Sequence, residues 1–211
     1  MLLVGIWTVI VGISLGWNIW NENEVIKKLA ENTARASFKK DLAFRLWISS
    51  HGGVYVPATD KTPPNPHLSH IPYRDIEKPD GTKLTLMNPA YMLHQMMTDH
   101  SGHYGIQGRI TSLKYFNVRN KPDEWEKQAL LDFEQGANEV FEYIEIEVKQ
   151  YLRLMRPMIT DNTCLKCHET QGYKVGDVRG GVGVSLPLQP LYEISSRNFN
   201  SLVIGHICIW L

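Results

Sequence analysis

The sequence predicts an α+β fold in which one antiparallel sheet carries helices on one side. Two patterns lead to this prediction. Residues 140–148 alternate between apolar and charged side chains, with Ile144 and Ile146 set against Glu145 and Glu147, which is typical of a half-buried strand. Residues 21–50 instead repeat apolar side chains every three or four positions, which is typical of an amphipathic helix. Both periodicities occur in a single chain of ordinary composition.

The first twenty residues contain no charged side chain, and a helix of that length spans ~30 Å of hydrocarbon. Trp17 and Trp20 lie where interfacial aromatic residues are favoured. A cleaved signal peptide is the alternative, but the run is long for one and lacks a clear small-x-small cleavage site. We therefore predict a transmembrane helix over residues 1–20 that continues directly into the helix over 21–50. Gly52-Gly53 should end that long helix.

The middle of the chain contains several local start and stop signals. Residues 54–56 form a predicted short strand, and the six prolines between positions 57 and 80 predict an ordered loop without regular structure. Asn88-Pro89 has the chemistry of an N-cap followed by a first-turn proline, so a helix should run to about His100. The further predicted elements are a strand over 105–113, a helix from 121–124 to Gly136, strands over 140–148 and 151–155, a loop carrying Cys164–His168, a glycine-rich strand over 180–186 and a helix from Leu188 onward.

The C-terminal residues 201–211 are apolar but too few to cross a bilayer. We expect residues 196–211 to begin a second transmembrane helix that is cut off at Leu211; a buried terminal helix is the alternative. Residues 21–195 then form one domain between two membrane segments. Lys plus Arg and Asp plus Glu both number 22 in 211 residues, so nothing in the charge balance indicates a nucleic-acid partner.

The chemistry of the chain centres on Cys164-Leu165-Lys166-Cys167-His168, a Cys-x-x-Cys-His run. Two thiols at this spacing can each bond to a vinyl group of one haem, and the histidine can bind the iron. A shuffled chain of this composition contains such a run in roughly two of a thousand cases. The sequence therefore predicts one covalently attached haem c, with Cys164 and Cys167 as attachment points and His168 as proximal iron ligand.

Three other interpretations of the two cysteines fit less well. Structural zinc needs four ligands, and Cys208 in an apolar run is the one remaining cysteine. A thioredoxin-like site would accompany a βαβ pattern, which is not visible. A Cys164–Cys167 disulfide would close a loop too small to stabilise much.

The ligand on the other side of the iron decides how such a site responds. We favour His51, which ends the long helix beside two glycines that would let a flat macrocycle approach. The alternative, which the sequence favours equally, is that His51 is protonated and caps the C-terminus of the helix. The full set of candidates is His51, His67, His70, Met92, His94, Met96, Met97, His100 and His103.

Haem carries two propionates, which arginine can bind with two parallel hydrogen bonds. Arg153 and Arg156 are the favoured propionate contacts, together with Arg45, and Arg74 is a further candidate. An ordinary surface role is the alternative for each.

Four segments taken together resemble the haem-c-binding, PAS-like periplasmic sensor family. They are residues 51–57 (HGGVYVP), 64–66 (PNP), 84–92 (LTLMNPAYM) and 164–168 (CLKCH), and the resemblance covers about residues 22–195. It implies a PAS-like antiparallel sheet with flanking helices, between two membrane helices, at the N-terminus of a bacterial histidine kinase, diguanylate cyclase or chemoreceptor. It also implies a distal ligand from the N-terminal helix region, where His51 is the matching position, and a homodimer.

The predicted function is that of a sensor domain anchored in the bacterial inner membrane and facing the periplasm, because haem is attached outside the cytoplasm. It would detect redox state or a diatomic gas and relay the change to a downstream signalling module, which is not in this chain. The alternative is a membrane-tethered monohaem cytochrome that exchanges electrons with a redox partner. We expect no enzymatic activity, since no distal acid–base group for a haem enzyme can be named.

Overall fold

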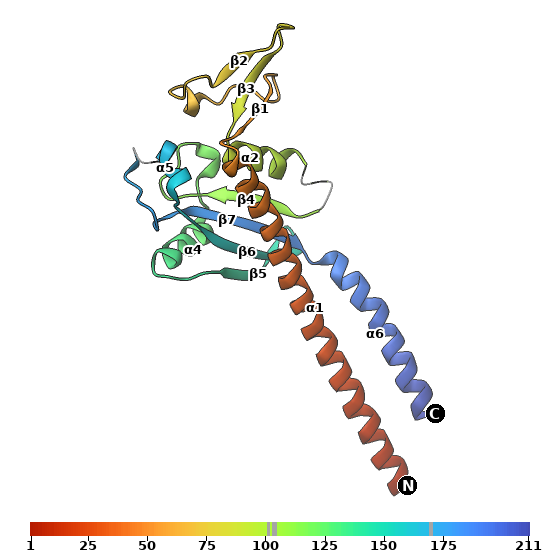
Figure 1. The fold of residues 1–211 in the computed structure, drawn as a ribbon. Coiled ribbons are helices and arrows are strands. Elements are labelled where there is room, and N and C mark those ends of the chain that lie inside the picture. The colour runs from red at the N-terminus through yellow and green to blue at the C-terminus, as the bar shows by residue number, and fades with distance from the viewer. Residues whose placement is uncertain (101, 103–104, 169–170) are drawn as a thin grey trace.

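The structure is a computed structural model that describes residues 1–100, 102, 105–168 and 171–211, without the side chains of Lys166 and Cys167. It confirms the α+β class (Figure 1). The elements are α1 (Leu2–Ser50), β1 (Val54–Pro57), η1 (Pro66–Leu68), β2 (Asp75–Glu77), β3 (Lys83–Met87), α2 (Pro89–Asp99), β4 (Gln107–Thr111), η2 (Val118–Asn120), α4 (Glu124–Glu134), β5 (Val140–Ile146), β6 (Lys149–Ile159), α5 (Asn162–His168), β7 (Val178–Pro187) and α6 (Gln189–Trp210).

Helix α1 runs without a break for 49 residues, as its uncharged start and periodic continuation predict. It ends at His51, and Gly52 follows with a φ of +74°, a left-handed conformation that glycine adopts without steric cost. The buried side chains of α1 begin only at Ile26, and the preceding apolar residues are exposed or partly exposed. Among the described residues, α1 is the one helix long and apolar enough to cross a membrane.

The main sheet has four antiparallel strands in the order β4-β7-β6-β5. Its β6 is apolar at successive positions, so it faces a core on both sides. Leu152 and Leu154 join α1 and α2 in one hydrophobic cluster, whereas Met155 packs with Leu130 and Phe133 of α4. The prediction of helices on one side is therefore wrong: α1 and α2 cover one face and α4 covers the other, because side chains alternate along β6.

A second, three-stranded antiparallel sheet in the order β1-β3-β2 lies at the end of the molecule farthest from the termini (Figure 1). The sequence pattern predicts a single sheet, with no strand over residues 83–87 and with residues 75–77 inside the proline-rich loop, so the second sheet is a correction. Strand β3 lies in the centre of this sheet, where it pairs with residues 54–57 on one side and 75–77 on the other. Its formation depends on partners distant in the sequence, which local patterning does not reveal.

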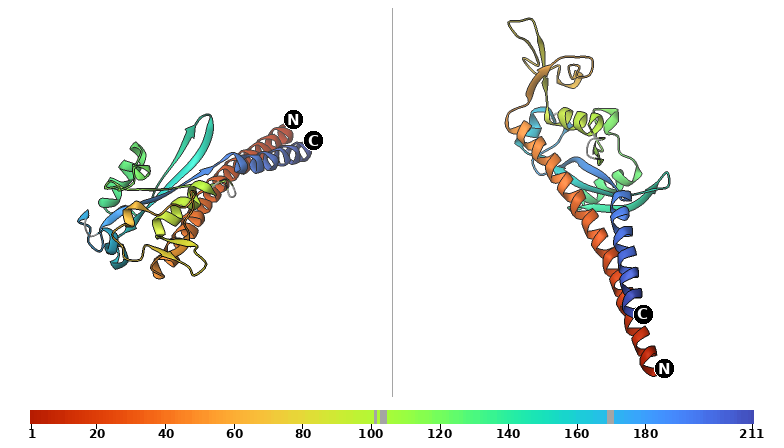
Figure 2. Two further views of the ribbon diagram at one scale, coloured as in Figure 1. Left: turned by 90° about the horizontal axis from the view of Figure 1, so that it is seen from above. Right: turned by 90° about the vertical axis from the view of Figure 1, so that its right-hand side faces the viewer.

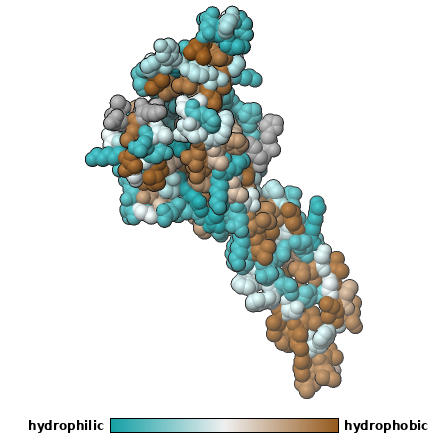
Figure 3. Space-filling view, in the orientation of Figure 1, coloured by the Kyte–Doolittle hydropathy of each residue, from teal (hydrophilic) through white to brown (hydrophobic). Residues whose placement is uncertain are grey.

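Helix α6 runs beside α1 away from the sheet, so both termini lie at the same end of the molecule (Figures 1 and 2). Polar contacts join the two helices: Asn198 Nδ2 donates to Glu22 Oε1 (2.9 Å), Ser14 Oγ lies 3.1 Å from His206 Nε2, and Trp210 Nε1 donates to Thr8 Oγ1 (2.9 Å). The far end of the pair carries a mostly apolar surface (Figure 3). The second transmembrane segment over 196–211 stays a prediction.

Candidate functional site

The Cys-x-x-Cys-His run lies on the short helix α5, and not in the loop that the sequence predicts. Asp161 begins this helix: its Oδ1 accepts hydrogen bonds from the backbone N–H groups of Thr163 (2.8 Å) and Cys164 (3.0 Å) and from the Thr163 hydroxyl (2.6 Å). These hydrogen bonds, that of the Thr163 hydroxyl above all, lower the pKa of Asp161 to about 2. The charged carboxylate thereby holds the motif in helical form. Cys164 is buried, and the Cys167 side chain lies outside the described part.

His168, at the end of α5, is oriented by a neighbouring amide. Its Nδ1 lies 2.8 Å from Gln171 Oε1, and Gln171 Nε2 donates to the Lys114 carbonyl (2.9 Å). With Nδ1 donating to Gln171, Nε2 keeps a lone pair for a metal. Burial, aided by the positive charges of Arg179 and Arg45, lowers the pKa of His168 to about 4. The imidazole is therefore neutral at pH 7, the form that binds iron.

A cavity of about 460 Å³ opens beside His168. Its size is within the range of pockets that hold cofactors. The walls come from α1, the proline-rich loop, α2, the end of β4 and the segment around η2; they include Arg45, Pro63, Pro66, His67, Ala90, Tyr91, His94, Ile110, Phe116, Arg119, Met158, His168 and Arg179. A smaller cavity of about 170 Å³ adjoins it, sharing Arg45, Asn88, Ala90 and His168, and is lined by Cys164.

The larger cavity is basic and apolar. Arg45, Arg119 and Arg179 line it, and no aspartate or glutamate is among its described lining residues. Arg179 donates from Nη1 to Ser112 Oγ (2.7 Å), but its buried Nε has no hydrogen-bond partner among the described residues. Arg45 Nη2 lies 3.7 Å from Cys164 Sγ. A ligand with an apolar body and acidic groups fits such a lining.

One aromatic ring, that of Phe116, lies against a face of the His168 imidazole. The Phe116 ring stacks on His168 with 5.9 Å between ring centroids and on His67 with 5.8 Å. Stacking covers one face of the imidazole and leaves its edge, where Nε2 lies, open to a metal. Within the described residues, no group of three or more His, Cys, Asp or Glu is placed to hold a metal ion.

His51 is the C-cap residue of α1. It is exposed, its Nδ1 lies 2.7 Å from the Trp47 carbonyl oxygen, and its ring lies 4.5 Å from that of Trp47. The linings of the two cavities contain His168 but not His51. Its role as distal ligand stays a prediction.

Arg153 and Arg156, the favoured propionate contacts, lie on opposite faces of β6. Arg153 pairs with Asp123 (2.7 Å) and lies over the Trp125 ring, whereas Arg156 pairs with Glu139 (2.6 Å) and lies over Phe38. Neither lines the larger or the smaller cavity described above. Their contact with propionates stays a prediction, and each already has a carboxylate partner.

The structure places the remaining candidates in different surroundings. Met97 is buried in the core, His70 and His100 are exposed, Met92 and Met96 are partly buried on α2, Arg74 pairs with Asp75, and His103 lies outside the described residues. Sequence reasoning missed Arg119, Arg179, Phe116 and Gln171. Gln171 could have been suggested by its spacing of three from His168; no local pattern marks the other three.

Comparison with known proteins places these observations in context. The sequence model of the Tll0287-like family (Tll0287) matches residues 22–187. A crystal structure of the cyanobacterial heme-protein Tll0287 is 17% identical over 76% of this chain and 95% of that chain, with a TM-score of 0.48. No curated protein matches the chain.

Proposed function

The chain belongs to the Tll0287-like family, whose model covers residues 22–187, and from this premise we propose that it binds one covalently attached haem c. A protein of known structure similar to this chain, Tll0287, is itself a heme-protein. The observation that carries the proposal lies in this chain: the histidine of a Cys-x-x-Cys-His run lines a basic, apolar cavity of about 460 Å³. Cys164 lines the cavity that adjoins it.

The residues present fit the group. Cys164 and Cys167 would form thioether bonds to the vinyl groups, and His168 would bind the iron through Nε2, while Gln171 fixes its orientation. Arg45, Arg119 and Arg179 would neutralise the propionates, and the unpartnered Nε of Arg179 offers a buried donor for one of them. Phe116 and the prolines of the loop would exclude water from the macrocycle.

We further propose that the domain is a sensor anchored by α1 in the bacterial inner membrane and facing the periplasm. Bound haem supplies an iron that changes oxidation state and can take a diatomic gas at an axial position. Arg45 of α1 lines both cavities, and α1 continues from there to the apolar segment 1–20. A change at the site would therefore act on the helix that enters the membrane, and from it on a downstream signalling module.

Attachment is tested by producing the chain in a host that matures c-type cytochromes. Haem-dependent peroxidase staining of a denaturing gel should show a covalent band for the wild-type chain and none for the Cys164→Ala, Cys167→Ala double variant. Cys208→Ala is the matched control, because Cys208 is exposed on α6, and it should keep the stain. Equal staining of the double variant would refute covalent attachment at these cysteines.

Sensing is distinguished from electron transfer by absorption spectra of the ferric and ferrous protein with and without CO and NO. A sensor should bind at least one gas, or change the environment of α1 between oxidation states. A spectrum inert to both gases, with no change along α1, would favour the electron-transfer alternative.

A further inference from the structure

One face of α2 points into the larger cavity. Ala90, Tyr91 and His94 follow at helical spacing and all line it. The neighbouring face carries Leu93 and Met97, which are buried in the main hydrophobic cluster with α1. These core contacts hold α2 in place, with His94 in the wall of the cavity that His168 also lines.

The Nε2 atom of His94 is buried and has no hydrogen-bond partner among the described residues. The adjacent Tyr91 on this face is satisfied, since its hydroxyl donates to the Pro63 carbonyl (2.9 Å). A buried polar atom without a partner is destabilising, and native proteins leave few such atoms unexplained. An iron atom in the cavity would give His94 Nε2 the partner that the protein does not.

The rival ligands are less well placed. His67 lines the cavity but is exposed, with its ring stacked on Phe116. Met158 also lines it, yet its thioether packs against the apolar core and needs no polar partner. His51 lies near the Trp47 carbonyl oxygen, outside both cavities.

We propose that His94 is the second axial ligand of the iron, so that the haem is held by two histidines, His94 from α2 and His168 from α5. This inference rests on the proposed attachment of haem to Cys164 and Cys167. It would have a consequence for signalling, because a gas would have to compete with His94 for the iron. Leu93 and Met97 pack in one cluster with Ala34 and Phe38 of α1. A movement of α2 on release of His94 would therefore change the packing of α1.

The test compares the ferric wild-type protein with His94→Ala by absorption and electron paramagnetic resonance. The wild-type haem should be low-spin, and the variant should become high-spin while its covalent haem stain stays equal to wild type. Added imidazole should restore the low-spin signal of the variant. His67→Ala, Met158→Leu and His51→Ala are the matched controls, and each should stay low-spin.

Three results would overturn the assignment: a high-spin wild-type protein, a low-spin His94→Ala without added imidazole, or conversion to high-spin by one of the control substitutions. If near-UV circular dichroism shows that His94→Ala is unfolded, His94→Met replaces it. That variant should gain a sulfur-to-iron charge-transfer band, and an unchanged two-imidazole spectrum would refute the role of His94. Absence of the covalent stain in the wild-type chain would instead refute the proposed function, so the two failures are distinct.

Discussion

At Asp161 a single carboxylate oxygen accepts three hydrogen bonds and converts the segment around the two cysteines into a helix. This cap affects the site directly, because α5 carries Cys164, Cys167 and His168 on a helix of 7 residues, about two turns. A helix this short is marginal on its own, so its cap matters more than in a long helix. The hydrogen bonds of Asp161 thus help to hold the Cys-x-x-Cys-His run in one helical conformation.

We predict that Asp161→Ala destabilises α5 by about 1 kcal/mol, with about fivefold faster hydrogen exchange over residues 162–168, because the cap hydrogen bonds are lost. Asp161→Asn is the control, since asparagine caps almost as well and should exchange nearly as the wild type does. Exchange is measured by mass spectrometry on the chain without haem, so that attachment does not mask the effect. Equal exchange in Asp161→Ala would show that the cap does not hold α5.

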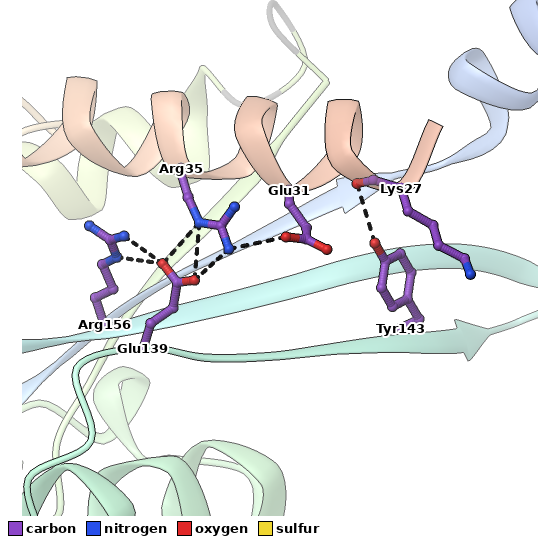
Figure 4. A network of polar contacts seen from close by, with 6 residues as sticks. All are labelled: Lys27, Glu31, Arg35, Glu139, Tyr143 and Arg156. Atoms are coloured by element: carbon purple, nitrogen blue, oxygen red, sulfur yellow. Dashed lines mark hydrogen bonds and ion pairs between the residues drawn. The ribbon is translucent and has the colours of Figure 1, made fainter. Parts of the chain in front are cut away.

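At the scale of elements, a charged network fixes α1 on the sheet (Figure 4). Arg35 of α1 donates to Glu139 Oε1 from Nη2 (2.8 Å), and Arg156 of β6 donates to Glu139 Oε2 from Nε (2.7 Å). Glu31 pairs with the same Arg35 guanidinium (3.1 Å), and the Tyr143 hydroxyl donates to the Lys27 carbonyl (3.4 Å). The Arg35–Glu139 and Tyr143–Lys27 contacts join α1 to the β5–β6 side of the sheet, where a movement of α1 would disturb them.

Glu139 makes this attachment dependent on pH. Burial works to raise its pKa, but hydrogen bonds from Arg35 and Arg156 outweigh burial and leave the pKa below the usual 4.5. A carboxyl whose folded pKa is depressed stabilises the fold above its unfolded pKa, and that stability is lost as the pH falls through the folded value. We predict that Glu139→Gln lowers the free energy of unfolding by about 1–2 kcal/mol at pH 7. The difference from wild type should shrink below pH 4.5.

Urea unfolding of both proteins between pH 3 and pH 7 measures this difference. Glu145→Gln on β5, the strand that directly follows Glu139, is the control, because Glu145 is exposed, and it should change stability little at any pH. A Glu139→Gln difference that is constant with pH would contradict the role of the charged carboxylate.

At the scale of the whole molecule, the two long helices project together from a compact sheet domain (Figure 2). The exposed apolar surface is concentrated toward the free end of the pair, and the charged residues of α1 begin at Glu22 (Figure 3). Exposed apolar side chains in such number are costly in water and favourable in lipid. This arrangement would set the cavity beside His168 well away from the membrane surface.

We predict that Ile10→Asp together with Ile13→Asp abolishes firm membrane association. Both residues are about half exposed or more, at 51% and 68%, and each aspartate costs about 2.5–3.5 kcal/mol near the centre of a membrane helix. Alkaline carbonate extraction of membranes should leave the wild type in the pellet and release the variant. Val25→Asp with Leu29→Asp is the control, with comparable exposure outside the apolar segment, and should stay in the pellet. Release of the wild type would show that α1 does not span.

The sequence by itself determined what depends on neighbours along the chain. The continuous helix from Leu2 to Ser50, the Asn88 cap with Pro89, the alternating strand from Val140 and the Cys-x-x-Cys-His run follow from periodicity and spacing within a few residues. The motif predicted the kind of cofactor for the same reason: its chemistry is contained in five consecutive positions.

Only the tertiary structure decided which distant residues share a site. The strands form two sheets, and helices cover both faces of β6. Arg153 and Arg156 form ion pairs with carboxylates, whereas Arg45, Arg119 and Arg179 line the cavity. The tertiary structure also set His94 and His168 around one space, although 74 positions separate them. Such pairings depend on how the faces of α1, α2 and the sheet pack together, and packing partners are chosen by complementary surfaces, which no local pattern in the sequence encodes.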